Sequence, residues 1–156
     1  MASHQELGEQ LNLFMIHPYT PGSVYLLPNG TIIYKALENY LRNEYKKRGY
    51  QEVITPQLAN VKLWKESGHW NHYKDNMFHV KIKNNESNIS GECDNDSELH
   101  SLKPMSCPMH CLMFWRGVVS YRSLPIRFAD FGVLHRNELA GALRGMTRLR
   151  IFCQDD

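Results

Sequence analysis

The pattern of hydrophobic and polar positions predicts two strands joined by a loop near the end of the chain. A partly alternating apolar run comes first, at Ile126, Phe128, Phe131 and Val133. Apolar and polar residues then alternate over 147–154, which is the period of a strand with one buried face. Gly141 and Gly145 lie between the two runs, so the connection can bend and can approach a ligand closely. We therefore expect a bent β-ribbon over 126–154.

The clearest helical pattern covers 31–48. Its apolar positions recur at helical spacing, at Ile33, Ala36, Leu37, Tyr40, Leu41 and Tyr45. We expect Asn29 or Thr31 to cap its start and Gly49 to end it. A strand that stops at Pro56 follows the helix.

Shorter elements are predicted on both sides of this pair. They are a helix at 5–11, a short buried strand at 24–27, a helical aromatic region at 57–76, a strand at 77–83 and a helix from Pro108 to Trp115 or Arg116. Residues 84–101 are rich in Asn, Ser, Asp and Glu, so we expect a flexible insertion there. The apolar run at 112–115 is expected in the core. The predicted fold class is α+β, an antiparallel sheet flanked by helices.

Composition narrows the class of protein. A chain of 156 residues holds one domain's worth of core at most. A net charge of +2 is too small to argue by itself for a nucleic-acid partner. The four cysteines follow no repeated spacing, which favours a reduced intracellular compartment over a disulfide framework. The polar N-terminal segment predicts no secretory signal, and the apolar runs are too short to span a membrane.

Two groups of side chains are candidates for chemistry. Arg136 and Arg148 flank the loop of the ribbon and can grip a phosphate or carboxylate. Glu138 is two residues from Arg136, so we expect it on the same strand face, where it can accept a hydrogen bond from an amino group. Most Arg/Glu pairs, however, are ordinary surface salt bridges. Cys107 opens the predicted helix, and His110 and Cys111 share its helical face.

These three side chains resemble a zinc site at first sight. The chain has no matching second pair of ligands, so we do not assign zinc to all three.

The amino-acid sequence of the ribbon resembles that of a known protein family. It contains His-Arg-Asn-Glu at 135–138, Gly-Ala-Leu at 141–143, Arg-Leu-Arg at 148–150 and Gln-Asp-Asp at 154–156. This stretch resembles motif 2 of class II aminoacyl-tRNA synthetases, in its threonyl-type, eukaryotic cytosolic form. The helix, strand and Pro56 resemble motif 1 at about 31–56, and 102–111 resembles the threonyl-type zinc segment. The resemblance implies that 1–156 is part of a catalytic domain, truncated before motif 3, with motif 2 at about 126–154.

The resemblance also implies a reaction, the ATP-dependent activation of threonine followed by its transfer to tRNA(Thr). Arg136 would bridge the threonine carboxylate and the α-phosphate, Glu138 would accept the adenine amino group, and Arg148 would hold the ATP phosphates with Mg²⁺. The predicted threonine pocket contains Met105, Cys107, Arg136, Gln154 and Asp156. His69 would relay a proton during transfer to tRNA, although packing beside Trp70 and Tyr73 explains this histidine equally well.

In this family only the cysteine of the 102–111 segment binds Zn²⁺, so Cys107 is the expected metal ligand, and two histidine ligands would lie beyond Asp156. Ser106 and Met109, which flank Cys107, differ from the residues that are usual in this family. The resemblance further implies a homodimer formed through motif 1 and a cytoplasmic location, with no membrane partner.

Two other interpretations compete. A non-catalytic synthetase-like paralogue, acting as a binding or regulatory module, has no use for Arg136, Glu138, Arg148 and Cys107 together. A seryl- or prolyl-type enzyme does not fit the Cys107 segment. Because motif 3 is not in the chain, we expect little or no activity from these residues alone.

Overall fold

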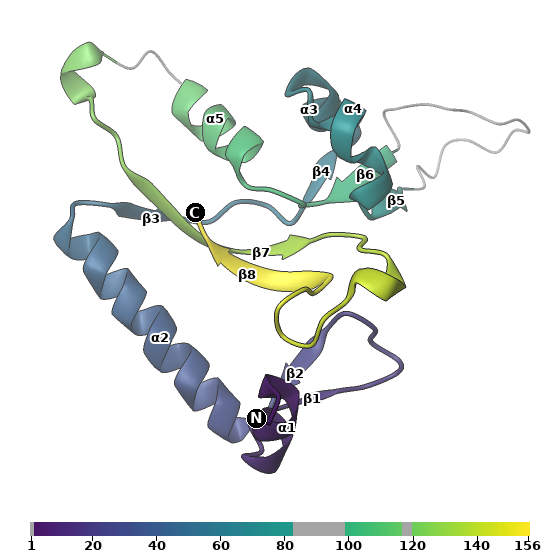
Figure 1. The fold of residues 1–156 in the computed structure, drawn as a ribbon. Coiled ribbons are helices and arrows are strands. Elements are labelled where there is room, and N and C mark those ends of the chain that lie inside the picture. Colours follow the sequence, from purple (N-terminus) through teal and green to yellow (C-terminus); the bar gives the residue numbers. More distant parts are fainter. Residues whose placement is uncertain (1, 83–98, 117–119) are drawn as a thin grey trace, which may run out of the picture.

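The α+β fold predicted from the sequence is confirmed by the computed structural model, which describes residues 2–82, 99–116 and 120–156. The strands form one two-stranded sheet and two three-stranded sheets, and nearly all of the strand pairs are antiparallel. Helices lie on both sides of the central ribbon, with α2 on one side and α3, α4 and α5 on the other (Figure 1).

The predicted ribbon forms the centre of the molecule. Its strands are β7 (Phe128–His135) and β8 (Ile151–Asp155), which pair in antiparallel register from Phe131 opposite Asp155 to His135 opposite Ile151. The second strand therefore begins later than the alternation suggested. The other edge of β7 pairs with β3 (Gln51–Val53) in parallel, which the prediction of an antiparallel sheet did not include.

Helix α2 (Pro28–Lys47) begins earlier than predicted, and neither expected cap is used. Its N-cap is Leu27, which makes no side-chain capping bond, and Pro28 occupies the first turn, where a missing N–H costs nothing. The predicted end is confirmed, because Gly49 follows the C-cap with φ of +77°. Near this end the Tyr45 hydroxyl donates a hydrogen bond of 2.8 Å to Asp155 of β8. Helix α2 is thereby fastened to the ribbon.

A second sheet lies on the opposite side of the ribbon. It consists of β4 (Leu58–Asn60), β6 (Leu99–Leu102) and β5 (His79–Lys81), all antiparallel. The region predicted as helical over 57–76 thus begins with a strand. The expected insertion over 84–101 is also too long, since β6 starts at Leu99, and residues 84–98 lie outside the described residues.

Short helices cover this second sheet. They are α3 (Val61–Glu66), α4 (His69–Tyr73) and the 3-10 turn η1 (Lys74–Asn76). A small apolar core joins them to helix α5 (Cys107–Trp115), through Val61, Trp64, Met77 and Met109. The start of α5 is therefore held by packing.

The far end of α5 is different from the prediction. The run at 112–115 was expected in the core, but in this chain Trp115 is 82% exposed and Leu112 and Phe114 are exposed as well. A strongly apolar sequence cannot show whether its partner lies within the same 156 residues, and here the described residues leave the run uncovered.

Two 3-10 turns complete the path of the chain, η2 (Tyr121–Ser123) and η3 (Ala140–Ala142).

The N-terminal segment packs against the loop of the ribbon. It contains α1 (His4–Gln10), which starts with a capping box between Ser3 and Glu6, and the hairpin β1 (Phe14–Ile16) and β2 (Val24–Leu26). The predicted strand at 24–27 is present, but it is not buried, because Tyr25 and Leu26 are exposed. In the described part of the chain, no helix is both long and apolar enough to cross a membrane.

Candidate active site on the ribbon

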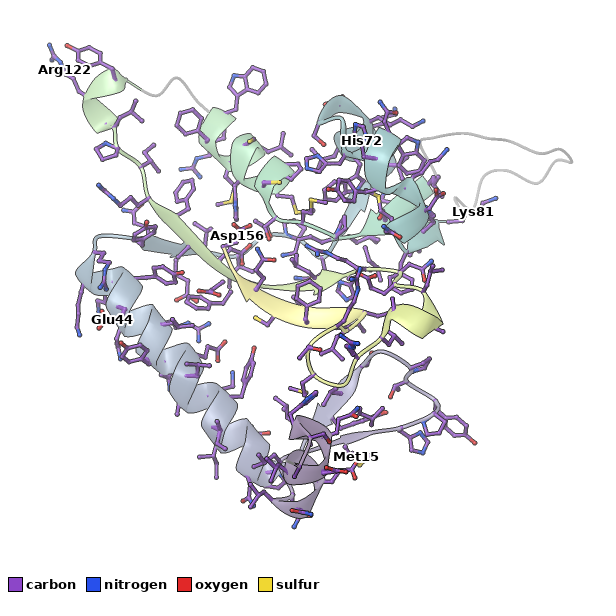
Figure 2. All side chains as sticks on the ribbon, viewed as in Figure 1. Met15, Glu44, His72, Lys81, Arg122 and Asp156 are labelled. Carbon is purple, nitrogen blue, oxygen red and sulfur yellow. The ribbon has the colours of Figure 1, made fainter. Side chains whose placement is uncertain are left out.

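The register of the ribbon places three of the predicted site residues, Arg136, Gln154 and Asp156, on one face. Leu134 lies opposite Phe152, and Gly132 lies opposite Gln154. Because side chains alternate along a strand, this face continues to Asp156 at one end and to Arg136 at the other. Figure 2 shows Asp156 near the centre of the molecule, where β8 ends.

Three predicted ATP-binding residues line one cavity at the mouth of the ribbon. Its volume is about 530 Å³, and it is lined by Arg136, Glu138, Met146, Thr147, Arg148, Leu149, Phe152 and Cys153. The Arg136 guanidinium carbon lies 5.0 Å from the centre of the Phe152 ring. Its Nε donates a bond of 3.3 Å to the Pro104 carbonyl. The cavity thus offers two guanidinium groups and a carboxylate beside an aromatic ring.

Two of these residues are paired with each other in the free chain. Arg148 donates from Nη2 and Nε to the same Glu138 oxygen, over 2.9 and 3.1 Å. The Glu138 carbonyl is held by Arg150 Nε at 2.9 Å. Since β7 ends at His135, Glu138 sits in the loop, whereas the sequence placed it on a strand face. An anion or nucleotide that binds here must compete with this ion pair.

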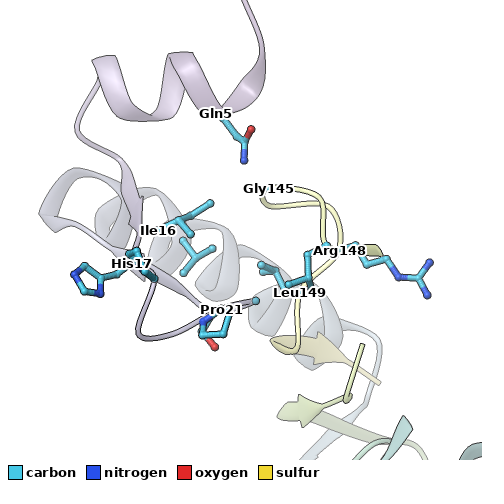
Figure 3. Close-up of a pocket in the computed structure, with 12 residues that line it drawn as sticks. Gln5, Ile16, His17, Pro21, Gly145, Arg148 and Leu149 are labelled. Atoms are coloured by element: carbon cyan, nitrogen blue, oxygen red, sulfur yellow. The ribbon is translucent and has the colours of Figure 1, made fainter. Parts of the chain in front are cut away.

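The loop is anchored to the N-terminal segment, which the sequence did not predict. The Arg150 amide donates a 2.7 Å bond to the Gly22 carbonyl, and the Met146 amide donates a 3.1 Å bond to His4 Nε2. A second cavity of about 440 Å³ lies between the two segments. In Figure 3, Ile16 and Leu149 point toward this cavity and the Arg148 guanidinium points away from it. The anchoring fixes the loop that carries the ATP-binding candidates.

Cys107 and His69 meet at the other end of the candidate site. Cys107 opens α5, and its Sγ lies 3.6 Å from His69 Nε2. The other ring nitrogen of His69 lies 2.9 Å from the Ser67 hydroxyl. Burial raises the pKa of the Cys107 thiol, and the negative charge of nearby Asp156 adds to the effect. Asp156 therefore lies on the same side of the molecule as Cys107.

The donor set fits a single metal ligand in this chain. No group of three His, Cys, Asp or Glu side chains able to hold a metal occurs among the described residues. His110 does not join Cys107, since its Nε2 lies 3.5 Å from Asp130 Oδ2, on the side that faces the sheet. Cys107 is exposed and free, so its sulfur is available to a metal whose remaining ligands come from elsewhere.

Arg136 and Cys107 are connected by a short segment, and Cys107 does not line the cavity that contains Arg136. The segment runs from Lys103 to Cys107, and its Pro104 carbonyl accepts the bond from Arg136. Met105 is half-buried within it, and Gln154 is half-buried on β8. The Pro104 carbonyl thus links this segment to Arg136 on the ribbon.

One buried group beside this segment was missed in the sequence. Lys103 is completely buried, and its Nζ donates a 2.8 Å bond to the Thr55 hydroxyl, which donates a 2.7 Å bond to Asp130. These residues are 48 and 75 positions apart in the chain. Each lies between apolar neighbours in the sequence, but no local pattern indicates that the three meet.

Comparisons with known proteins give consistent results. The model of the tRNA synthetase class II core domain (G, H, P, S and T) matches residues 86–156. A relative named probable threonine–tRNA ligase 2, cytoplasmic, from Dictyostelium discoideum is 53% identical over 156 residues, which is all of this chain and 20% of the relative. The human protein named threonine–tRNA ligase 1, cytoplasmic, is 50% identical over 153 residues, 98% of this chain and 19% of its own length.

Solved structures agree with the sequence relatives. The crystal structure of the RNA binding domain of threonyl-tRNA synthetase from Cryptosporidium parvum Iowa II has a TM-score of 0.88 and 46% identity, covering 99% of this chain and 36% of that one. A putative threonyl-tRNA synthetase from Aeropyrum pernix has a TM-score of 0.81 and 30% identity, covering 99% and 34%.

The chain spans about a fifth of the length of the curated relatives it matches. Identity near 50% extends over essentially all of its residues, and the class II core model covers the ribbon and the Cys107 segment. This chain belongs to the threonyl-tRNA synthetase family of class II aminoacyl-tRNA synthetases.

Proposed function

We propose that the protein containing this chain is a cytoplasmic threonine–tRNA ligase. The reaction activates threonine with ATP and then transfers the threonyl group to tRNA(Thr). The observation that carries this proposal is the cavity at the mouth of the ribbon, where Arg136, Arg148 and Glu138 converge beside the segment that leads to Cys107. The names of the relatives support the same reaction.

The two guanidinium groups and the carboxylate of the cavity suit a nucleoside triphosphate. In the activation step an oxygen of the threonine carboxylate attacks the α-phosphorus of ATP, and the bond to the leaving pyrophosphate breaks. Arg136 would neutralise charge on the carboxylate and α-phosphate. The ion pair between Arg148 and Glu138 would break, and Arg148 would then bind the phosphates together with Mg²⁺. The freed Glu138 carboxylate would accept a hydrogen bond from the adenine amino group. Little covalent chemistry falls to the protein, whose work is positioning and charge neutralisation.

The threonine end of the site is proposed at Cys107, Met105, Gln154 and Asp156. Asp156 lies near Cys107 and carries the negative charge that a substrate ammonium requires. Cys107 would supply one thiolate to Zn²⁺, and binding of the metal would oppose the raised pKa of this thiol. A zinc ion bound there would separate threonine from valine through the threonine hydroxyl, since an apolar pocket alone discriminates such pairs only about a hundredfold.

His69 is the proposed proton relay for transfer to tRNA. The imidazole is held between the Ser67 hydroxyl and Cys107 Sγ, which fixes its plane. A ribose hydroxyl of the tRNA would lose its proton to this ring as it attacks the activated threonyl carbonyl, and AMP would leave.

The apolar face of α2 is the proposed homodimer contact. Ile33, Leu37 and Tyr40 follow helical spacing, and each is more than half exposed in the isolated chain. Such a stripe on a long helix indicates a surface that another protein segment covers.

The test is ATP–pyrophosphate exchange by the full-length protein purified with zinc. We expect exchange that depends on threonine and does not occur with valine, and no exchange by the 156-residue chain alone. Binding of threonine or tRNA without any exchange would favour the non-catalytic paralogue. Robust exchange by the 156-residue chain would show that these residues suffice for activation.

A further inference from the structure

Burying the Lys103–Thr55–Asp130 group costs free energy, so a contribution to stability does not explain its presence. Lys103 and Asp130 are removed from water, yet the Lys103 Nζ to Asp130 Oδ2 distance is 3.8 Å and the Thr55 hydroxyl mediates between them. Burying two charges is expensive, and apolar residues of similar volume often stabilise a protein as well or better. The role of this group therefore lies in the segments that it connects.

The group joins three parts of the molecule that build the candidate site. Thr55 follows β3, Asp130 lies in β7, and Lys103 follows β6 and begins the segment that ends at Cys107. The backbone of Lys103 is fixed too, because its amide donates to the Gln57 carbonyl and its carbonyl accepts from the His135 amide, both over 2.8 Å.

Each charged member of the group continues directly into a different half of the site. One residue after Lys103, the Pro104 carbonyl accepts the bond from Arg136. Asp130 exchanges two backbone hydrogen bonds with Asp156, of 2.9 and 3.0 Å. The same three side chains thus fix the Cys107 segment and the end of β8 relative to each other.

The ribbon is built to admit the lysine. A Cβ added at Gly132 would lie 2.6 Å from Lys103 Nζ and 3.1 Å from Asp130 Oδ1. The ammonium group therefore lies against the backbone of β7, on the ribbon face that carries Gln154.

We propose that Lys103, Thr55 and Asp130 are positioning residues that set the distance between the Cys107–Asp156 end of the site and Arg136. The inference rests on the proposed function. The ATP-binding loop has its own anchors at Gly22 and His4, so the positioning group acts mainly on the threonine end.

Two substitutions at Thr55 provide a matched test in the full-length, zinc-loaded protein. Thr55→Val keeps the shape and both buried charges but removes the hydroxyl that links them, whereas Thr55→Ser keeps the hydroxyl. We expect Thr55→Val to raise the KM for threonine about tenfold in pyrophosphate exchange and to change the KM for ATP by less than about threefold. Thr55→Ser is expected to stay within about twofold of the unmodified protein for both.

A second readout needs neither metal nor activity. In the metal-free protein, hydrogen exchange at the Lys103 and His135 amides should be faster in Thr55→Val than in Thr55→Ser, because the hydrogen bonds of both amides hold the backbone of Lys103.

A second pair of substitutions removes the charges themselves. Lys103→Met alone leaves the Asp130 carboxylate buried without the ammonium group that balances its charge and is expected to lose folded protein. Lys103→Met combined with Asp130→Asn removes both charges. This double variant should fold and show the same selective rise in the KM for threonine, and adding Thr55→Val to it should cause no further rise, because the three residues act as a unit.

Equal threonine KM values for Thr55→Val and Thr55→Ser would overturn the inference. So would a parallel rise in both KM values, since that indicates a general loss of structure. If the unmodified protein shows no threonine-dependent exchange, the proposed function itself fails, and the inference fails with it.

Discussion

Replacing Gly132 with alanine tests whether Lys103 is held tightly beneath the ribbon. The added methyl group would lie 2.6 Å from Lys103 Nζ, whereas ordinary contact begins at 3.4 Å, so the ammonium group has to move by about 0.8 Å. The 2.8 Å bond to Thr55 would then lengthen beyond hydrogen-bonding distance. Because Lys103 is fully buried, no water can replace the lost partner.

The expected cost combines two effects. Forcing extra volume into a packed interior costs about 1–3 kcal/mol. Weakening a buried hydrogen bond to a charged group adds about 1.5–3 kcal/mol. We therefore expect Gly132→Ala to lower the free energy of unfolding by about 2.5–6 kcal/mol.

Two other glycines provide controls that separate space from backbone conformation. An added Cβ at Gly141 meets nothing within 4 Å, and this glycine has no positive φ. We expect Gly141→Ala to change stability by less than about 0.5 kcal/mol. Gly49 has equal space but a φ of +77°, so Gly49→Ala should cost about 1–2 kcal/mol from backbone strain alone.

The assay is urea denaturation followed by tryptophan fluorescence, for which the fully buried Trp64 is a suitable reporter. If Gly132→Ala proves as stable as Gly141→Ala, then Lys103 is free to move and the reasoning about the buried group is wrong.

Three further predictions follow from named contacts. Ser3→Ala removes the capping box with Glu6 and should destabilise the N-terminal helix by about 1 kcal/mol, measured by denaturation; no change would show that the cap is not formed in solution. Burial lowers the pKa of His135, so the unfolded chain takes up a proton first as the pH falls through about 6.5. The free energy of unfolding should therefore fall below this pH, with a slope of at most about 1.4 kcal/mol per pH unit. His135→Asn should remove that contribution, and an unchanged slope in the variant would contradict the prediction. Glu138→Ala removes both the proposed adenine acceptor and the partner of Arg148, so the KM for ATP should rise at least about tenfold while the KM for threonine stays the same; an unchanged KM for ATP would remove Glu138 from the nucleotide site.

Local periodicity predicted the elements that are governed by local rules. The ribbon strands, the end of α2 at Gly49 and the start of α5 near Pro108 were all recognisable, because alternation, a left-handed glycine and a first-turn proline act over a few residues. The start of α2 was placed too late, since Pro28 begins the helix without the help of a capping side chain.

Long-range pairing was the part that the sequence could not supply. The parallel contact of β3 with β7 joins Gln51 to Phe128, and no local pattern specifies it. The predicted burial of 112–115 was wrong for a related reason. Apolar composition indicates that a surface is covered by a partner, but it does not specify where that partner lies.

The candidate site divides in the same way. Arg136, Glu138 and Arg148 were predicted from their place around the loop, and the structure brings them into one cavity. Lys103 and Thr55 were not predicted, because their role exists only once three distant segments are packed together. The roles proposed for Cys107 and His69 stay predictions, although the two side chains do lie side by side.

One face of the ribbon is proposed to hold ATP at the Arg136 end and threonine at the Cys107 end. A crystal structure of the full-length protein with zinc and a non-hydrolysable threonyl-adenylate analogue would show where both substrates bind. We expect the Arg136 guanidinium to contact the phosphate mimic, Glu138 to accept from the adenine amino group, and the threonyl amino group to lie beside Asp156. An analogue bound away from this face, or bound there without contacting Arg136, would contradict the account.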